Sequence, residues 1–222
     1  MIDILTRVIK EHSHWLRHKE AKLSFLKFST PSSGTEYNHG KVLLFVFEEG
    51  EQMPTLCVKT VRTYAAGGSI RKSFANLKML HAGVAGTKLQ TIFAEPLYLH
   101  DTGETIFSIE SACAGQSLSS QPEKLDLVLE QYQAWQKHVV QSGLQHGDLT
   151  PDNVIVNGDK VSIVDYDYVG TDWPEGFDLF CLIWKSKFGE KETKDYLKRY
   201  LPPNPPFALY KEADTRRKEN KI

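Results

Sequence analysis

The order of the predicted elements constrains this chain most, because strands fill its first half and helices its second. Short apolar, alternating or β-branched runs indicate strands at residues 23–28, 41–48, 54–62, 91–99 and 104–111. Apolar residues at helical spacing predict helices at residues 122–142, 177–187 and 192–201. An alternating βαβ sheet would interleave the two kinds. The order therefore predicts an α+β fold with an antiparallel sheet lobe and a mainly helical lobe.

Two further helices and a tail complete this outline. Residues 2–16 place apolar side chains at helical spacing, and residues 69–81 follow the Gly67-Gly68 break with the same periodicity. The tail from Lys211 is rich in charge and is predicted to be disordered. We expect two domains, an N-terminal lobe at residues 1–111 and a C-terminal lobe at residues 112–222.

Charge, hydropathy and cysteine content exclude several classes of protein. The chain of 222 residues carries 27 basic and 28 acidic side chains, so its charge balance requires neither a nucleic acid nor an anionic membrane as partner. The longest apolar run, residues 42–47, is far too short to span a membrane. Its three cysteines include no CxxC pair, which argues against a disulfide framework and a zinc site. We expect a cytoplasmic protein.

Two acidic motifs separated by a hairpin carry the chemistry. The segment 146–153 reads His-Gly-Asp-Leu-Thr-Pro-Asp-Asn, and Asp165-Tyr166-Asp167 follows a turn at Asn157-Gly158-Asp159. The hairpin folds the chain back, so Asp148, Asn153 and Asp165 are predicted to converge at one end of it. Carboxylate and amide oxygens are ligands that Mg²⁺ accepts, and phosphoryl transfer also needs a carboxylate that orients the attacking hydroxyl.

These motifs resemble a known family. HGDLxxxN followed by DxD is similar to the aminoglycoside phosphotransferase and choline kinase family of the protein-kinase-like superfamily, with motif-level similarity over residues 145–179. The resemblance implies a two-lobed protein-kinase-like fold. It also implies that Asp148 is the catalytic base, that Asn153 and Asp165 are catalytic metal ligands, and that Asp167 assists at the metal or the acceptor. Asp178 would receive backbone amides of the catalytic loop, and His146 would pack beneath that loop.

The same resemblance implies ATP and Mg²⁺ as cofactors and assigns nucleotide-binding residues. Lys59 would contact the α- and β-phosphates, although a lone lysine on a strand is more often a surface residue. Ser33 and Gly34 lie in a loop that either covers the phosphates or is an ordinary hairpin turn. Glu110 and Ala112 lie in the hinge that would bind adenine through main-chain groups.

One departure from the family concerns the partner of Lys59. The family pairs this lysine with a glutamate on the following helix, but Ser73 stands at that position. No acidic residue occurs anywhere between residues 58 and 93. Either a carboxylate reaches Lys59 from elsewhere, such as the N-terminal helix, or the phosphates of the nucleotide serve as its counter-charge.

Three functions remain open. The first is a kinase that transfers the γ-phosphoryl group of ATP to a hydroxyl of a small molecule, an amino alcohol or a sugar. The second is a pseudokinase-like nucleotide-binding module, and the third, a protein kinase, is disfavoured because the loop lacks His-Arg-Asp. Four aromatic residues either form an acceptor wall or belong to the core: Tyr166, Tyr168, Trp173 and Trp184. Because the C-terminal lobe is short, it also remains open whether a second subunit completes the acceptor pocket.

Overall fold

The computed structural model describes residues 1–29, 40–138 and 143–219, which fall into two compact units. The first unit comprises Met1–Lys78 and Ala94–Ala114, and the second comprises Met79–Phe93 and Gly115–Ile222. The sequence predicts one boundary after residue 111. The structure places a boundary at Ala114/Gly115 and additionally assigns residues 79–93 to the second unit.

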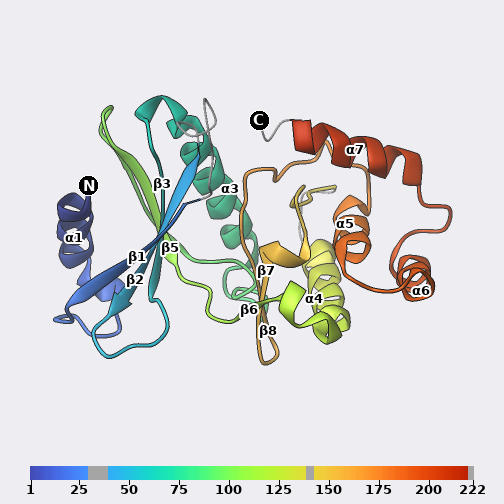
Figure 1. Cartoon of the computed structure of the whole chain (residues 1–222), viewed down its shortest axis with the longest axis horizontal. Coiled ribbons are helices and arrows are strands. Elements are labelled where there is room, and N and C mark those ends of the chain that lie inside the picture. The colour runs from blue at the N-terminus through green and yellow to red at the C-terminus, as the bar shows by residue number, and fades with distance from the viewer. Residues whose placement is uncertain (30–39, 139–142, 220–222) are drawn as a thin grey trace. The chain divides into compact units, whose positions relative to one another are not determined.

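A five-stranded antiparallel sheet forms the frame of the first unit (Figure 1). The strand order is β1-β2-β3-β5-β4, and the strands are β1 (Leu23–Ser29), β2 (Lys41–Glu48), β3 (Leu56–Val61), β4 (Pro96–Asp101) and β5 (Ile106–Ser111). Burial alternates strictly along β2, as a strand with one covered face requires. In the central strands β3 and β5, five consecutive residues are buried, so side chains on both faces are shielded from water.

Helix α1 (Ile2–Glu11) covers one face of this sheet (Figure 1). Its buried residues Leu5, Val8 and Ile9 recur at intervals of three and one, which places them on one side of the helix. They join a core cluster with residues from β2, β3 and β5. The helix is shorter than predicted, because the chain leaves it after Glu11 and continues as a 3₁₀ turn at Ser13–Trp15.

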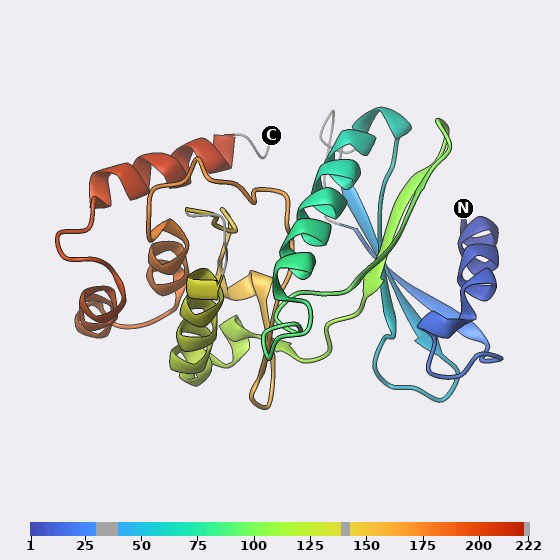
Figure 2. The same cartoon turned by 180° about the vertical axis from the view of Figure 1, so that it is seen from behind.

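Helix α3 (Gly68–Val84) begins in the first unit and ends in the second. Its first turns lie on the side of the sheet opposite to α1 (Figures 1 and 2). Ile70, Phe74 and Leu77 are buried at helical spacing, which explains why the periodicity of residues 69–81 predicted this helix. The helix packs closely at its start, since a Cβ atom at Gly67 would lie 2.9 Å from the Ile106 side chain.

Helices dominate the second unit, together with a small three-stranded sheet. The helices are α4 (Leu125–His138), α5 (Phe177–Lys185), α6 (Glu190–Tyr200) and α7 (Phe207–Glu219). The sheet has the order β6-β7-β8, with β6 (Gln116–Ser117), β7 (Val154–Asn157) and β8 (Lys160–Ile163). The β7–β8 pair is the predicted hairpin turned at Asn157-Gly158. Seven consecutive residues of α5, from Phe177 to Ile183, are buried, so this helix forms the centre of the unit.

Two sequence predictions about secondary structure are wrong. Residues 91–99 do not form one strand: β4 begins at Pro96, whereas Phe93 makes an isolated bridge with Ile163 of the second unit. The charged tail is helix α7, which buries Tyr210, Ala213 and Arg217 at helical spacing. The pattern was missed because an arginine occupies a core-facing position. Among the described residues, no helix is long and apolar enough to cross a membrane.

Candidate active site

The loop 145–150 is held from below by the buried carboxylate of Asp178, at the start of α5. The backbone amides of His146 and Gly147 donate hydrogen bonds to it at 2.5 and 2.9 Å, and the Tyr132 hydroxyl donates a third. Burial raises the pKa of the Asp178 carboxyl, while these hydrogen bonds and the neighbouring His146 oppose the rise. Asp178 therefore anchors the loop through its amides, as the sequence predicts.

His146 fixes the loop from within. Its Nδ1 accepts the amide of Asp148 at 3.3 Å, and its Nε2 lies 3.1 Å from the carbonyl of Val164. Only the neutral tautomer with a proton on Nε2 satisfies both contacts. Burial lowers the pKa of the imidazole, which favours this neutral form. The residue is 1% exposed and packs beneath the loop as predicted, where it ties Asp148 to the segment before Asp165.

Gly147 is required by the shape of the loop. Its φ is +80°, in the left-handed region that glycine adopts without strain. A Cβ atom there would lie 2.3 Å from the carbonyl oxygen of Tyr168 and 2.4 Å from Nε1 of Trp173. That indole in turn donates a 2.8 Å hydrogen bond to the same carbonyl. The turn at Gly147 thus sets the direction in which Asp148 leaves the loop.

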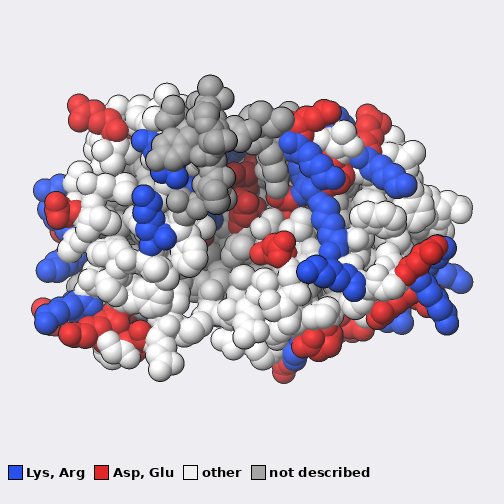
Figure 3. Space-filling model, viewed as in Figure 1, with Lys and Arg blue, Asp and Glu red and all other residues white. Residues whose placement is uncertain are grey.

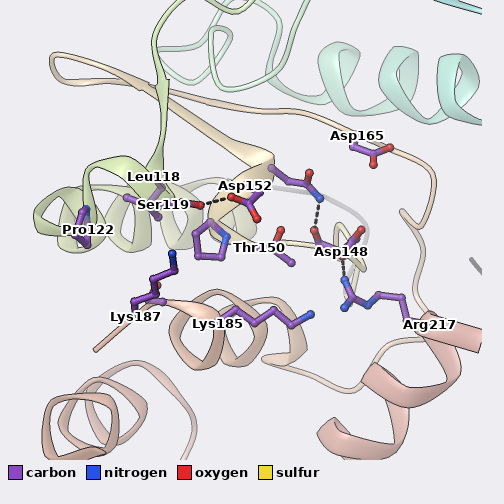
Figure 4. A pocket seen from close by; sticks show the side chains of 13 residues that line it. Leu118, Ser119, Pro122, Asp148, Thr150, Asp152, Asp165, Lys185, Lys187 and Arg217 are labelled. Atoms are coloured by element: carbon purple, nitrogen blue, oxygen red, sulfur yellow. Dashed lines mark hydrogen bonds and ion pairs between the residues drawn. The ribbon is translucent and has the colours of Figure 1, made fainter. Parts of the chain in front are cut away.

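Asp148, Asn153 and Asp165 line one cavity of about 460 Å³ within the second unit (Figure 4). The Asn153 Nδ2 group donates to the Asp148 carbonyl at 2.8 Å. The amide of Val164 donates to the Asn153 carbonyl at 2.9 Å, which brings the chain entering Asp165 beside the catalytic loop. Asp165 has a φ of +67°, a conformation that aspartate tolerates better than most residues. The structure therefore brings together the three residues that the motifs single out.

The oxygen donors of this cavity suit a magnesium ion. Because Nδ2 of Asn153 is engaged with the loop, its Oδ1 is oriented away from that bond, and Asp165 supplies a carboxylate in the same cavity. Magnesium commonly takes one or two protein ligands and completes its shell with water and phosphate oxygens. The described residues include no group of three His, Cys, Asp or Glu side chains that could hold a metal by themselves. Asp167, also predicted as a ligand, is half-buried and does not line this cavity.

Three cations also line the cavity, and sequence reasoning assigned none of them to it. Lys185 and Lys187 come from α5 and the turn after it, and Arg217 comes from α7. The Arg217 guanidinium forms an ion pair with Asp148, and its other terminal nitrogen lies 2.6 Å from Asp214. Lys185 also pairs with Asp214, at 2.9 Å. A signal for Arg217 was present in the sequence, since it follows Tyr210 and Ala213 at intervals of three and four.

The aromatic residues considered for an acceptor wall lie elsewhere. The Tyr166 side chain is fully buried and donates to the Ile163 carbonyl, and Trp173 stacks on Phe177 with an interplanar angle of 7°. Trp184 is 53% exposed on α5. Neither these residues nor Tyr168 lines the cavity that contains Asp148. Tyr166 is therefore a core residue, which is one of the two alternatives that the sequence left open, and the half-buried Trp173 packs on Phe177.

Lys59 has a carboxylate partner in the first unit, and it comes from a neighbouring strand. Its Nζ lies 2.8 Å from the Glu110 carboxylate, with both residues buried at 6% and 4% exposure. The register of β3 and β5 pairs Lys59 with Ser108, so Glu110 is its diagonal neighbour on the same face. Ser73, at the family's glutamate position, is buried on α3, and its hydroxyl has no hydrogen-bond partner among the described residues.

Two residues of the predicted hinge make contacts within the sheet unit. Glu110 lies in β5 between β3 and β4, and its side chain is committed to Lys59. The amide of Ala112 donates to the carbonyl of Thr55 at 3.0 Å, so this amide is not available to adenine. Ser33 and Gly34, in the loop that either covers the phosphates or is an ordinary hairpin turn, lie outside the described residues.

Comparisons with known proteins agree with this architecture. The sequence model of the phosphotransferase enzyme family (APH) matches residues 43–211, more than half of the chain. A crystal structure of a type VIII aminoglycoside-3'-phosphotransferase is similar with a TM-score of 0.56 and 15% identity, over 86% of this chain and 93% of the other. The bifunctional kinase-methyltransferase WbdD is similar with a TM-score of 0.54 and 15% identity, over 86% of this chain and 46% of the other. A search of curated proteins gave no significant match.

The strand order of the first unit, the anchored loop of the second and the family match lead to one assignment. The fold is the α+β, kinase-like fold of the aminoglycoside phosphotransferase to which the chain is similar. This chain belongs to the phosphotransferase enzyme family.

Proposed function

We propose that the protein is a magnesium-dependent kinase that transfers the γ-phosphoryl group of ATP to a hydroxyl group of a small molecule, an amino alcohol or a sugar. The observation that carries this proposal is the joint lining of one cavity by Asp148, Asn153 and Asp165. The buried anchors Asp178 and His146 support it further, because they hold the loop that presents Asp148. A solvated acidic turn would need no such anchoring.

Asp148 would act as the catalytic base. Its carboxylate orients the acceptor hydroxyl and accepts its proton as the oxygen attacks the γ-phosphorus. A bond forms between that oxygen and phosphorus, the bond to the β,γ-bridging oxygen breaks, and ADP leaves. The proton then passes from Asp148 to solvent. Asn153 and Asp165 would hold magnesium, which neutralises phosphate charge when bound.

Lys59 would contact the nucleotide phosphates, with Glu110 as the residue that positions it. A buried ammonium needs a counter-charge, and Glu110 supplies one at 2.8 Å. The only support for a pseudokinase was that Ser73 stands where the family has the glutamate partner of Lys59. The Glu110 carboxylate can take the place of that glutamate, so this support is weakened. The kinase is therefore the function that we favour.

Nucleotide-dependent thermal stabilisation tests this function. We expect ATP to raise the melting temperature more with magnesium than without it, because a ligand that binds only the folded state stabilises that state. Asp165→Asn should lose the magnesium-dependent part of the rise. The control Asp172→Asn changes an exposed aspartate that does not line the cavity, and it should behave like the parent. An Asp165→Asn variant with an undiminished magnesium effect would refute the metal assignment.

A further inference from the structure

The cavity around Asp148 carries a cationic wall, which we define as Lys185, Lys187 and Arg217. All three side chains line the cavity, and in Figure 4 they lie along its lower edge while Asp165 lies along the upper edge. Figure 3 shows a band of Lys and Arg side chains on the half of the molecule that holds α5 and α7. The wall belongs to the second unit, whereas Lys59, which we propose contacts the nucleotide phosphates, belongs to the first.

Acidic residues lie beside the wall: Asp148, Asp152 and Asp165 line the same cavity, and Asp148 forms an ion pair with Arg217. The Asp214 carboxylate forms ion pairs with Lys185, Arg217 and Lys218, with N–O distances of 2.6 to 2.9 Å. Lys187 is exposed and forms no ion pair with any described residue. Its ammonium group therefore lines the cavity without an acidic partner from the described part of the chain.

Arg217 is the least expected member of the wall. It is 3% exposed, and burial lowers the pKa of its guanidinium, so a substantial desolvation cost attends its placement. Its Nε atom is buried and has no hydrogen-bond partner among the described residues, although Asp148 and Asp214 meet the terminal nitrogens. A planar guanidinium with an unused donor is suited to a carboxylate or phosphate group entering the cavity.

We propose that the cationic wall binds an anionic group on the acceptor, so that the substrate is a hydroxyl compound bearing a phosphate or carboxylate. This inference rests on the proposed function and specifies the acceptor for the same site. Arg217 contacts the Asp148 carboxylate, so an anion on the wall lies beside the base that receives the hydroxyl proton. Lys185 and Lys187 bind the same anion from the side of α5.

The charge of the wall discriminates against the other acceptor class. At the wall itself, like-charge repulsion weakens the binding of a polycationic acceptor, such as an aminoglycoside, or of a quaternary ammonium, while Asp148, Asp152 and Asp165 lie elsewhere in the lining. No aromatic residue among the described residues lines the cavity to offset that repulsion by cation–π contact. Acceptor charge therefore separates this protein from relatives that act on cationic compounds.

The first test uses inorganic phosphate as the probe, with the full chain and saturating magnesium and AMP-PNP present. The nucleotide analogue occupies the nucleotide's own phosphate-binding residues, so added phosphate reports on the wall. We expect millimolar phosphate to raise the melting temperature by about 2–4 °C above chloride at matched ionic strength. Lys187→Gln and Arg217→Gln should each reduce this rise by at least half. Lys191→Gln, an exposed lysine on α6 outside the cavity, should preserve it.

Each outcome of this test bears on the inference. If phosphate stabilises no more than chloride does, or if all variants respond like the parent, the wall is not an anion site. Displacement of AMP-PNP by phosphate would show that the cations serve the nucleotide and would also overturn the inference. Since Arg217→Gln removes a buried side chain, Lys187→Gln decides the result if the arginine variant does not fold.

The second test compares acceptors that differ in one anionic group. Binding and phosphorylation are measured for glucose, glucose 6-phosphate, glucuronate, ethanolamine and kanamycin. We expect at least tenfold tighter binding of an anionic sugar than of glucose, and the better of the two anions identifies phosphate or carboxylate as the group. Equal or tighter binding of glucose or a cation would overturn the inference. Anion-selective binding with no transfer to any acceptor would instead count against the proposed kinase function.

Discussion

Two buried ion pairs, one in each unit, hold the most important charged residues of this protein, and they are built differently. Lys59 and Glu110 are diagonal neighbours on one sheet, so the register of β3 and β5 fixes their distance. Asp148 and Arg217 come from a loop and from the last described helix, and Arg217 divides its guanidinium between Asp148 and Asp214. The first pair is internal to a rigid sheet, whereas the second lines a cavity open to ligands.

This difference suggests different roles for the two partners. A pair fixed by strand register holds the lysine side chain in one position. This suits a residue that binds the nucleotide phosphates in every catalytic cycle. A pair at the wall of a cavity can exchange one carboxylate for a ligand anion, because both buried groups border that cavity. Five predictions break or sharpen this comparison, from the largest expected effect to the smallest.

Substitution of Asp148, the proposed catalytic base in the second ion pair, should have the largest effect on activity. We expect Asp148→Asn to lower kcat for phosphoryl transfer by about 10³-fold, since general base catalysis of this kind contributes 10² to 10⁴-fold. Nucleotide binding, measured by calorimetry, should change less than threefold. Asp159→Asn in the exposed hairpin turn provides the control. A variant that retains more than a tenth of the parental kcat would show that Asp148 is not the base.

Removal of the carboxylate from the first pair should destabilise the fold strongly. Glu110→Gln removes the carboxylate that lies 2.8 Å from the buried Lys59 ammonium, and we expect a loss of about 3–5 kcal/mol in the free energy of unfolding. Arg217→Met should cost less, about 1–2 kcal/mol, because Asp214 keeps Lys185 and Lys218 as partners and Asp148 borders the cavity. Urea unfolding measures both.

A double variant separates charge from packing at the first pair. Lys59→Met with Glu110→Leu removes both charges, so we expect stability to return to within about 1 kcal/mol of the parent. The double variant should not bind nucleotide, because it lacks the Lys59 ammonium that we propose contacts the phosphates. Glu104→Gln, on the exposed approach to β5, controls for the loss of an acidic charge. The comparison between the two pairs fails if Glu110→Gln proves no more damaging than Arg217→Met.

Gly147→Ala tests whether the Asp148 loop depends on close packing. The alanine Cβ would meet Tyr168 and Trp173 at under 2.5 Å, in addition to the strain of a φ of +80°. We expect a loss of about 2–3 kcal/mol. Gly143→Ala is a matched control, since Gly143 has a φ of +81° but, its chain neighbours aside, no atom of the described residues lies within 4 Å of its Cβ position. Equal losses in the two variants would mean that backbone strain alone explains the effect.

The smallest effect is expected from the pH dependence of His146. Burial lowers its pKa in the folded state, so the unfolded chain binds the proton more readily, and stability falls as pH drops through the unfolded value of about 6.5. This residue should contribute a loss of about 1 kcal/mol between pH 7.5 and pH 5.5. His146→Gln should flatten the urea-unfolding profile over this window. If the slope is the same in both proteins, the imidazole is not held neutral.

Much of the fold followed from local patterns. The alternation Val42, Leu44, Val46 predicted β2 with the bounds that it has, because a half-buried strand requires that period. The turn Asn157-Gly158 predicted the β7–β8 hairpin, since few other residue pairs accept its backbone angles. The strand expected at residues 91–99 was wrong because Phe93 bridges to β8 and only the later residues join the larger sheet.

The candidate site was predictable where one short segment carries it. Asp148 and Asn153 lie in one loop, and the hairpin returns Asp165 to that loop, so sequence spacing was sufficient to associate the three. Glu110 was assigned to an adenine hinge instead of to Lys59, because a sequence without strand register does not reveal diagonal neighbours. Arg217 was placed in a disordered tail because charge, read without tertiary context, indicates solvent exposure.

By itself the sequence determined the α+β order of elements and the acidic loop with its hairpin, because both depend on residues close along the chain. Only the tertiary structure decided which charges meet. Strand register delivers Glu110 to Lys59, and the packing of α7 delivers Arg217 to Asp148. The physical reason is that an ion pair between distant segments leaves no periodic trace in the sequence, whereas burial of apolar faces does.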